Sequence, residues 1–206
     1  MNANILKRYV IYMAIATFIM FTTWALVRSY MNRPPGDYET EVCDIRLKDK
    51  LYDQALEAAS KALNKSPFHR GAMMCKALVY ISLKDYKKAT KELNELINFL
   101  ENNLEIDDKT GTGTLAAAYA NRGIIKDRQE NYEGALKDYV EALKIDSESV
   151  DGPGIGTVIL NYKFKSSSVR KRAQYIYEQL QLPKEERVLK IKELDEGQVM
   201  HKPGKL

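Results

Sequence analysis

The feature that most restricts the possible fold is an internal repeat in the centre of the chain. Three stretches superimpose, and each contains a tyrosine followed three residues later by an alanine. These pairs are Tyr52/Ala55, Tyr86/Ala89 and Tyr132/Ala135. Another small residue stands twelve positions before each alanine, namely Cys43, Ala77 and Gly123. Self-similarity of this kind is typical of chains built from stacked supersecondary units.

The alternation of small and large residues has a simple physical purpose. A small residue on each of two antiparallel helices lets their backbones approach closely, and a bulky apolar residue of the next turn fills the groove that results. We therefore expect Gly123 and Ala135 to lie at one helix crossing. Tyr132 and Tyr139 should pack beside it.

The pattern resembles the tetratricopeptide repeat, a helix–turn–helix unit with a 34-residue period. The first two alanines are 34 residues apart and the third follows after 46, which predicts a 12-residue insertion. We assign the insertion to a loop at 100–113, because that stretch is rich in Gly, Thr and Asp. The resemblance covers residues 36–149, and it departs from the family pattern where a tryptophan is common. Glu39, Met73 and Tyr119 stand there instead.

The resemblance implies an all-α superhelix of about three repeats, with ligands held in a groove lined by the first helix of each pair. The family's lining positions correspond here to Thr40, Asp44, Met74, Cys75, Leu78, Ile81, Asn121, Ile124, Asp127 and Arg128. The alternative is a covered groove, in which Leu78 and Ile124 pack against the insertion or the C-terminal helices.

One subclass of the family holds the acidic tails of heat-shock chaperones with a clamp of Lys, Arg and Asn. The clamp positions are occupied here by Thr40, Asp44, Cys75, Ala117 and Asn121. Without cationic groups a dicarboxylate tail would be held poorly. We therefore expect a different ligand.

The C-terminal part of the chain predicts capping helices. Residues 166–182 place apolar side chains on one face at helical spacing, and Pro183 can open a second helix in its first turn. We assign 150–195 to helices that cover the exposed end of the superhelix, which a repeat array needs for solubility. Residues 196–206 should form a loose tail.

The N-terminal part predicts a membrane anchor. Tyr9 to Val27 contains no charged residue, and a helix of this length spans roughly 28 Å, close to the hydrocarbon thickness of a bilayer. A buried core helix and a cleavable signal peptide are the alternatives. We favour an uncleaved anchor, with 1–8 as a short tail and 28–35 as a proline-stiffened linker. Lys7 and Arg8 on the N-terminal side favour, weakly, a domain outside the cytoplasm.

The charge distribution argues against nucleic acid as a partner. The formal charge of +4 is carried by the four basic residues of 1–35, and the rest of the chain holds 28 basic and 28 acidic residues. The basic balance therefore belongs to the flanks of the apolar segment and not to a nucleic-acid surface.

Catalytic and metal-binding patterns are missing from the sequence. The glycine-rich stretch 151–156 lacks the Lys-Ser/Thr of a phosphate loop, and the two histidines, His69 and His201, lie in unrelated settings. We expect no enzyme activity, no cofactor, no metal and no small-molecule substrate. Cys43 and Cys75 are interpreted as reduced, with Cys43 a buried small residue; a disulfide is the alternative outside the cytoplasm.

Together these features predict a single-pass membrane protein that displays a tetratricopeptide-like domain and binds other proteins, especially membrane-associated ones. In arrangement it looks like bacterial inner-membrane repeat proteins that assist the assembly of larger complexes. The alternatives are a permanent subunit of a membrane complex and a receptor that faces the cytoplasm. An enzyme is the rival from another class.

Overall fold

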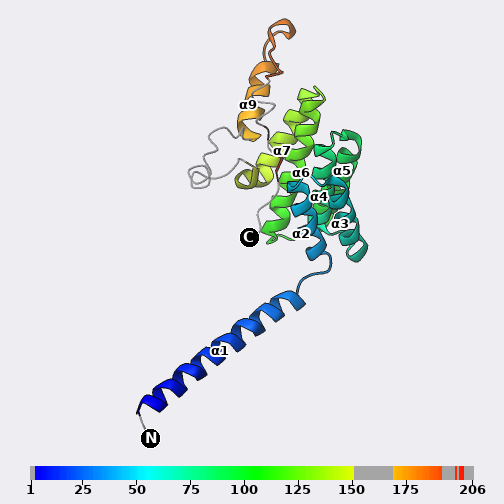
Figure 1. Cartoon of the computed structure of the whole chain (residues 1–206). Helices are drawn as coiled ribbons and strands as arrows, with labels where there is room; N and C mark the ends of the chain where they lie inside the picture. The colour runs from blue at the N-terminus through cyan, green and yellow to red at the C-terminus, as the bar shows by residue number, and fades with distance from the viewer. Residues whose placement is uncertain (1–2, 151–168, 192–197, 199, 202–206) are drawn as a thin grey trace.

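A computed structural model describes residues 3–150, 169–191, 198, 200 and 201 of the chain. Expectations for 151–168 and 192–197 lie outside this range. The described residues form α-helices joined by short turns (Figure 1). The helices are α1 (Ala3–Met31), α2 (Asp37–Lys48), α3 (Tyr52–Lys65), α4 (Arg70–Ser82), α5 (Tyr86–Asn103), α6 (Lys109–Arg128), α7 (Tyr132–Val150) and α9 (Val169–Leu180), followed by the 3₁₀ turn η1 (Lys184–Glu186).

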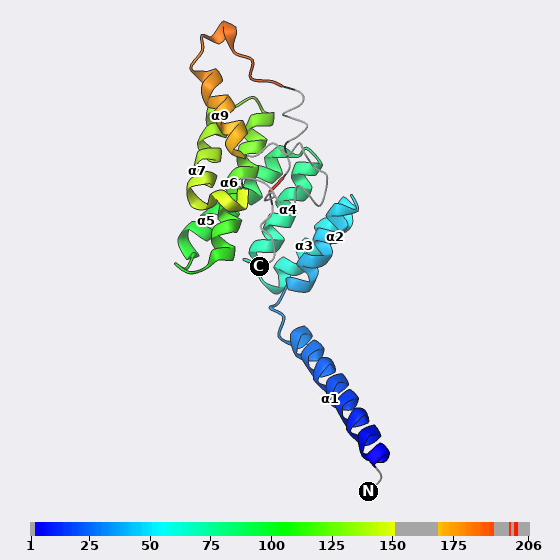
Figure 2. The same cartoon turned by 90° about the vertical axis from the view of Figure 1, so that its left-hand side faces the viewer.

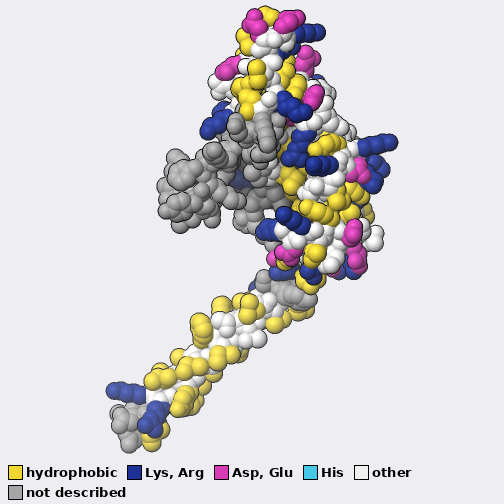
Figure 3. All heavy atoms as spheres, turned by 45° about the horizontal axis from the view of Figure 1, so that its top comes forward, with side chains coloured by type: hydrophobic (Ala, Val, Ile, Leu, Met, Phe, Trp, Pro, Cys, Tyr) yellow, Lys and Arg dark blue, Asp and Glu magenta, His cyan; other side chains and the backbone are white. Residues whose placement is uncertain are grey.

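Helix α1 stands apart from the other helices (Figures 1 and 3). Its stretch Ile5–Arg28 is long and apolar enough to cross a membrane, and none of it is buried inside the protein. The hydroxyls of Thr17, Thr22 and Thr23 donate to backbone carbonyls one turn earlier, at 2.7–2.9 Å. These three hydroxyls are thereby satisfied within the helix, which suits a hydrocarbon environment.

Helices α2 to α7 form three antiparallel pairs, α2/α3, α4/α5 and α6/α7. Each pair turns through one non-glycine residue in the left-handed region, with φ of 60–62° at Lys50, Lys84 and Glu130. The same turn thus recurs in every repeat. Side chains then cap the following helices: Asp85 accepts from the Lys88 backbone N–H at 3.1 Å, and Asn131 from that of Gly134 at 3.0 Å.

The structure confirms the predicted crossing of α6 and α7. A Cβ atom added to Gly123 would lie 2.6 Å from two ring carbons of Tyr139 and 3.3 Å from the carbonyl oxygen of Ala135. Tyr139 and Ala135 are both buried, and Tyr132 packs at the edge of the same cluster. Only a glycine leaves room here for the tyrosine ring.

The expectation that both cysteines are reduced is wrong. Cys43 of α2 and Cys75 of α4 form a disulfide with a Cα–Cα distance of 6.4 Å, and both residues are fully buried. The bond joins the first helices of repeats one and two. It packs within a small apolar cluster together with alanines of α3 and Val79.

The expected loop at 100–113 is also wrong, because helices extend into it from both sides. Helix α5 continues to Asn103 and α6 begins at Lys109, so only 104–108 lie outside a helix. Asp108 caps α6 by accepting from the Gly111 backbone N–H at 2.7 Å, and it also pairs with Arg70 of α4. The extra residues therefore lengthen two helices instead of forming a separate loop.

Helix α9 packs on α7 at the end of the stack away from α2 (Figure 2). The second capping helix predicted after Pro183 does not form, since only η1 is helical between 183 and 191. Side chains of α9 hold the backbone there: Gln179 Oε1 accepts from the Val188 N–H at 2.7 Å, and the Tyr175 hydroxyl donates to the Val188 carbonyl. These bonds engage the backbone N–H and carbonyl of Val188, which a helix would use for its own hydrogen bonds.

Candidate functional site

The first helices of the three repeats, α2, α4 and α6, lie side by side and form the face that the sequence assigns to ligands. On α6 this face carries Asn121, Ile124 and Asp127, spaced three residues apart and therefore on one side of the helix. On α4 it carries Met74, Leu78 and Ile81. We call this surface the inner face.

The structure places most of the predicted groove residues out of contact with solvent. Eight of the ten are buried, Asp44 is intermediate and only Arg128 is exposed. The buried eight are Thr40, Met74, Cys75, Leu78, Ile81, Asn121, Ile124 and Asp127. The inner face is therefore covered in this structure.

Residues of the C-terminal tail contribute to this cover. Met200 packs against the apolar cluster that contains Met74, Leu78 and Ile81. The tail residues that the structure describes are thus not loose, contrary to the expectation from sequence. Ile124 belongs to a second cluster, together with apolar residues of α7 and α9.

Asn121 binds the tail through its main chain. The side-chain Nδ2 donates to the carbonyl oxygen of His201 at 2.7 Å, and Oδ1 accepts from the His201 backbone N–H at 2.8 Å. One amide side chain therefore satisfies both backbone groups of one tail residue. Such a contact recognises an extended polypeptide without requiring a particular side chain at that position.

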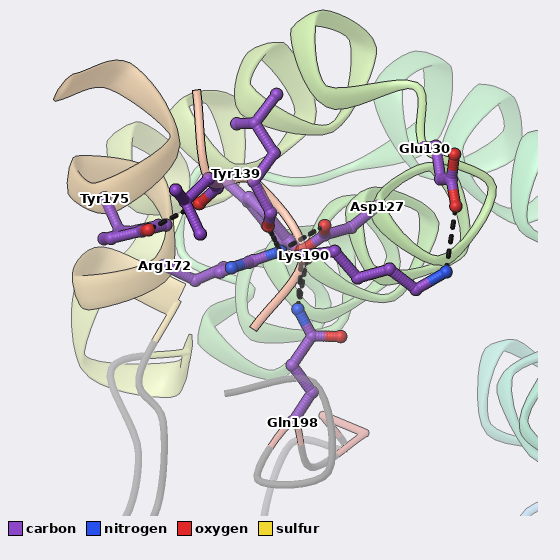
Figure 4. A network of polar contacts seen from close by, with 9 residues as sticks. Asp127, Glu130, Tyr139, Arg172, Tyr175, Lys190 and Gln198 are labelled. Atoms are coloured by element: carbon purple, nitrogen blue, oxygen red, sulfur yellow. Dashed lines mark hydrogen bonds and ion pairs between the residues drawn. The ribbon is translucent and has the colours of Figure 1, made fainter. Parts of the chain in front are cut away.

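Asp127 lies at the centre of a polar network on the same helix face (Figure 4). Arg172 of α9 donates to both of its oxygens at 2.7 Å, the hydroxyl of Tyr139 donates at 3.1 Å, and Nε2 of Gln198 donates at 2.6 Å. The network joins α6, α7, α9 and the tail. Together with the Asn121–His201 contact, it connects the described tail residues to the repeats.

The ion pair in this network is fully desolvated. Both side chains are 2% exposed, and Nη2 of Arg172 also donates to the Leu189 carbonyl at 3.1 Å. The buried site and the neighbouring carboxylate raise the pKa of Tyr139 well above its ordinary value. The raised pKa favours the protonated hydroxyl, which is the form that donates to Asp127.

Sequence reasoning missed Arg172, Gln198 and His201. A signal existed for Arg172, because it falls between Val169, Ala173 and Ile176 on the apolar face of its helix. An arginine in that position needs a buried acidic partner. Nothing comparable marks Gln198 or His201, which lie in a short stretch without periodicity.

The positions of the chaperone-type clamp hold no cationic side chain. Thr40 shares a hydrogen bond of 3.3 Å with Nδ1 of His69, the residue that caps α4, and Cys75 is engaged in the disulfide. Ala117 is fully buried. Asn121 is fully buried, and both polar atoms of its side chain bind the His201 main chain.

A hollow of about 340 Å³ lies between α7 and α9. Its lining combines apolar side chains with acidic and basic ones. The lining residues are Glu133, Leu136, Lys137, Val140, Glu141, Lys144 and Leu180. Over the part of the chain that the structure describes, no cluster of His, Cys, Asp or Glu could hold a metal ion.

Comparison with known proteins agrees with this geometry. Residues 116–149, the greater part of α6 and nearly all of α7, match the family model "Tetratricopeptide repeat". This is a tetratricopeptide repeat fold. The match begins seven residues after the start of α6, so the extra residues of the third repeat lie at that end of the helix.

A solved tetratricopeptide structure has the same architecture. It is the first tetratricopeptide domain of Spaghetti (RPAP3) bound to the HSP90 peptide SRMEEVD, at 18% sequence identity and a TM-score of 0.50. The alignment covers 72% of this chain and 94% of that chain. At this identity the likeness shows the fold alone. No curated protein sequence matches the chain.

Proposed function

We propose that this chain is a membrane-anchored interaction protein whose inner face binds an extended segment of a partner protein. The tetratricopeptide fold supports a role in protein–protein interaction. The observation that carries the proposal is the paired contact of Asn121 with both backbone groups of His201. It provides, on α6, a polar group that recognises the main chain of an extended polypeptide.

The expected ligand differs from the peptide bound in the similar structure. That protein binds an HSP90 peptide rich in acidic residues. Here the clamp positions hold no cation, and the Asp127 carboxylate is already paired with Arg172, so the inner face lacks the clamp that holds an acidic tail. The partner segment should therefore offer an uncharged hydrogen-bond donor where it passes Asp127, as Gln198 does, and be apolar where it meets Met74, Leu78 and Ile81.

The anchor and the disulfide together support a location. The apolar stretch of α1 would confine the domain to a membrane surface, where partners in the same membrane are at a high effective concentration. The disulfide between Cys43 and Cys75 favours an oxidising compartment. We propose a domain outside the cytoplasm, as on the outer side of a bacterial inner membrane, in preference to a receptor facing the cytoplasm.

The proposal can be tested by crosslinking in living cells. A photoreactive amino acid is placed at Arg128, the exposed edge of the inner face, or at Lys137, an exposed control position on α7. We expect defined membrane-protein adducts from position 128 and none from 137. The Asn121→Leu variant, of similar size, should lose them while its thermal melt remains cooperative.

The design includes a chain that ends at Ile191 and therefore lacks the tail. If neither this chain nor the full-length chain gives adducts at position 128, the inner face is not a partner site. Adducts that persist unchanged in Asn121→Leu would likewise exclude the contact on which the proposal depends.

A further inference from the structure

We propose that the C-terminal segment 198–201 is a built-in competitor for the inner face, seated where a partner segment would bind, so that partners gain access only by displacing it. This inference rests on the proposed function of the same face. It assigns an occupant that is visible in the structure and a regulatory consequence.

The first step is the geometry of the segment. Gln198 lies at Asp127 and His201 lies at Asn121, so the tail runs antiparallel to α6. Three residue steps of extended chain cover about 10 Å, and six residues of helix rise about 9 Å. The two lengths agree, so an extended segment is long enough to reach from Asp127 to Asn121 along the helix.

The second step is the variety of its contacts. Gln198 gives a side-chain donor to Asp127, Met200 places an apolar side chain against the cluster of Met74, Leu78 and Ile81, and His201 is held by its main chain. A partner segment that binds the same face would offer the same series: a donor, an apolar side chain two residues later, and then a residue with a free backbone N–H.

The third step is that release of the tail does not leave a buried charge without its partner. Asp127 keeps both hydrogen bonds from Arg172 and the one from Tyr139 when Gln198 departs. No buried charge is left unpaired, so release does not carry the penalty of breaking a buried ion pair. The helices themselves do not depend on the tail for their hydrogen bonds.

The fourth step is the strength of the competition. The tail is tethered to the domain, and a short tether gives an effective concentration on the order of 1 mM. Because the tail is docked in the structure, a partner that binds the free inner face must first displace the tail. The apparent affinity of the partner is therefore reduced by about the ratio of protein molecules with a docked tail to those with a free tail.

The experiment measures how a peptide binds with and without the tail. The probe is a fluorescent peptide of residues 193–206, added to the full-length chain, to a chain ending at Ile191, to Met200→Asp and to Val188→Asp, all in detergent micelles. Val188 is exposed in the same C-terminal region, so its substitution controls for the added charge. Each protein is first shown to melt cooperatively.

We expect the chain ending at Ile191 to bind the peptide at least tenfold more tightly than the full-length chain. Met200→Asp should approach the shortened chain, and Val188→Asp should match the wild type. A peptide with Pro in place of His201 should bind the shortened chain at least tenfold more weakly than one with Ala there, because proline has no N–H to donate to Oδ1 of Asn121.

Equal peptide affinity of the full-length and shortened chains would overturn the inference, and so would absence of binding to the shortened chain. The full-length protein could instead form a dimer in which each tail crosslinks to the other copy. That result would overturn the assignment of the tail to its own chain. The proposed function is judged separately. Equal crosslinking at position 128 with and without the tail leaves that function standing while the competitor is rejected.

Discussion

Replacing Gly123 by alanine tests the packing logic of the repeat directly. The added Cβ would lie 2.6 Å from the Tyr139 ring, and contacts between real Cβ atoms and other carbons are not that short. The ring would have to move by about 1 Å in an interior that is close-packed. It is 1% exposed, and its hydroxyl is bonded to Asp127 at 3.1 Å.

The expected change in the free energy of unfolding follows from two destabilising contributions and one stabilising contribution. Overpacking costs about 1–3 kcal/mol, and loss of the tyrosine hydrogen bond adds about 1 kcal/mol. Alanine in a helix is more favourable than glycine by about 0.5–1 kcal/mol, which offsets part of the loss. We expect Gly123→Ala to lower the free energy of unfolding by about 1–3 kcal/mol.

The assay is chemical denaturation followed by far-ultraviolet circular dichroism, with Tyr139→Leu as a second background. Removing the ring leaves room for the methyl group, so Gly123→Ala should be neutral or stabilising in the Tyr139→Leu chain. The two effects should therefore be non-additive by about 2 kcal/mol. If Gly123→Ala destabilises both backgrounds equally, or stabilises the wild type, then Gly123 does not serve to admit the tyrosine.

Three further predictions concern the turns, the ion pair and the tail. Lys84→Gly should stabilise the domain by about 0.5–1 kcal/mol, because Lys84 has a φ of 60°, whereas Lys87→Gly on the exposed side of α5 should destabilise it by about 1 kcal/mol. Arg172→Leu should destabilise the domain by about 3–5 kcal/mol in the same melt, since it leaves the Asp127 carboxylate buried without its cation. Burial lowers the pKa of His201 from 6.5 to about 4, so the neutral ring is favoured in the docked tail. The equilibrium constant for docking should be largest above pH 6.5 and should fall by about tenfold per unit between pH 6.5 and about 4. Tail release, followed by a fluorophore at the C-terminus, should lose this pH dependence in His201→Gln.

The sequence was sufficient for the repeats because one pattern encodes both the helices and their packing. The small residue at Gly123 and the large one at Tyr139 indicate the crossing without knowledge of the fold. The error at 100–113 arose because glycine has two uses. Gly111 lies inside α6, where an added Cβ would collide with the Leu104 side chain, so it permits close packing and does not mark a loop.

The disulfide was the alternative and not the prediction, because the distance between Cys43 and Cys75 does not follow from the sequence alone. Equivalent positions in stacked repeats are separated by the distance between helix axes, about 8–10 Å. Cys43 and Cys75 are 32 residues apart and not 34, and it is this offset that lets their Cα atoms approach to 6.4 Å. The tail was missed for a different reason. An extended segment held by main-chain contacts to Asn121 leaves no periodic pattern in its own residues.

The disulfide also allows the orientation of the domain to be measured. The two basic residues before the apolar stretch, Lys7 and Arg8, oppose two after it, Arg28 and Arg33, so charge alone decides little. If the domain lies in an oxidising compartment, a maleimide reagent added to denatured protein taken directly from cells should modify both cysteines only after reduction. Modification without reduction would place the domain in a reducing compartment. Because the bond closes a loop of 32 residues, the double substitution of Cys43 and Cys75 by alanine should lower stability by about 3–4 kcal/mol. That loss should disappear in a strong reductant, where the wild type is no more stable than the variant.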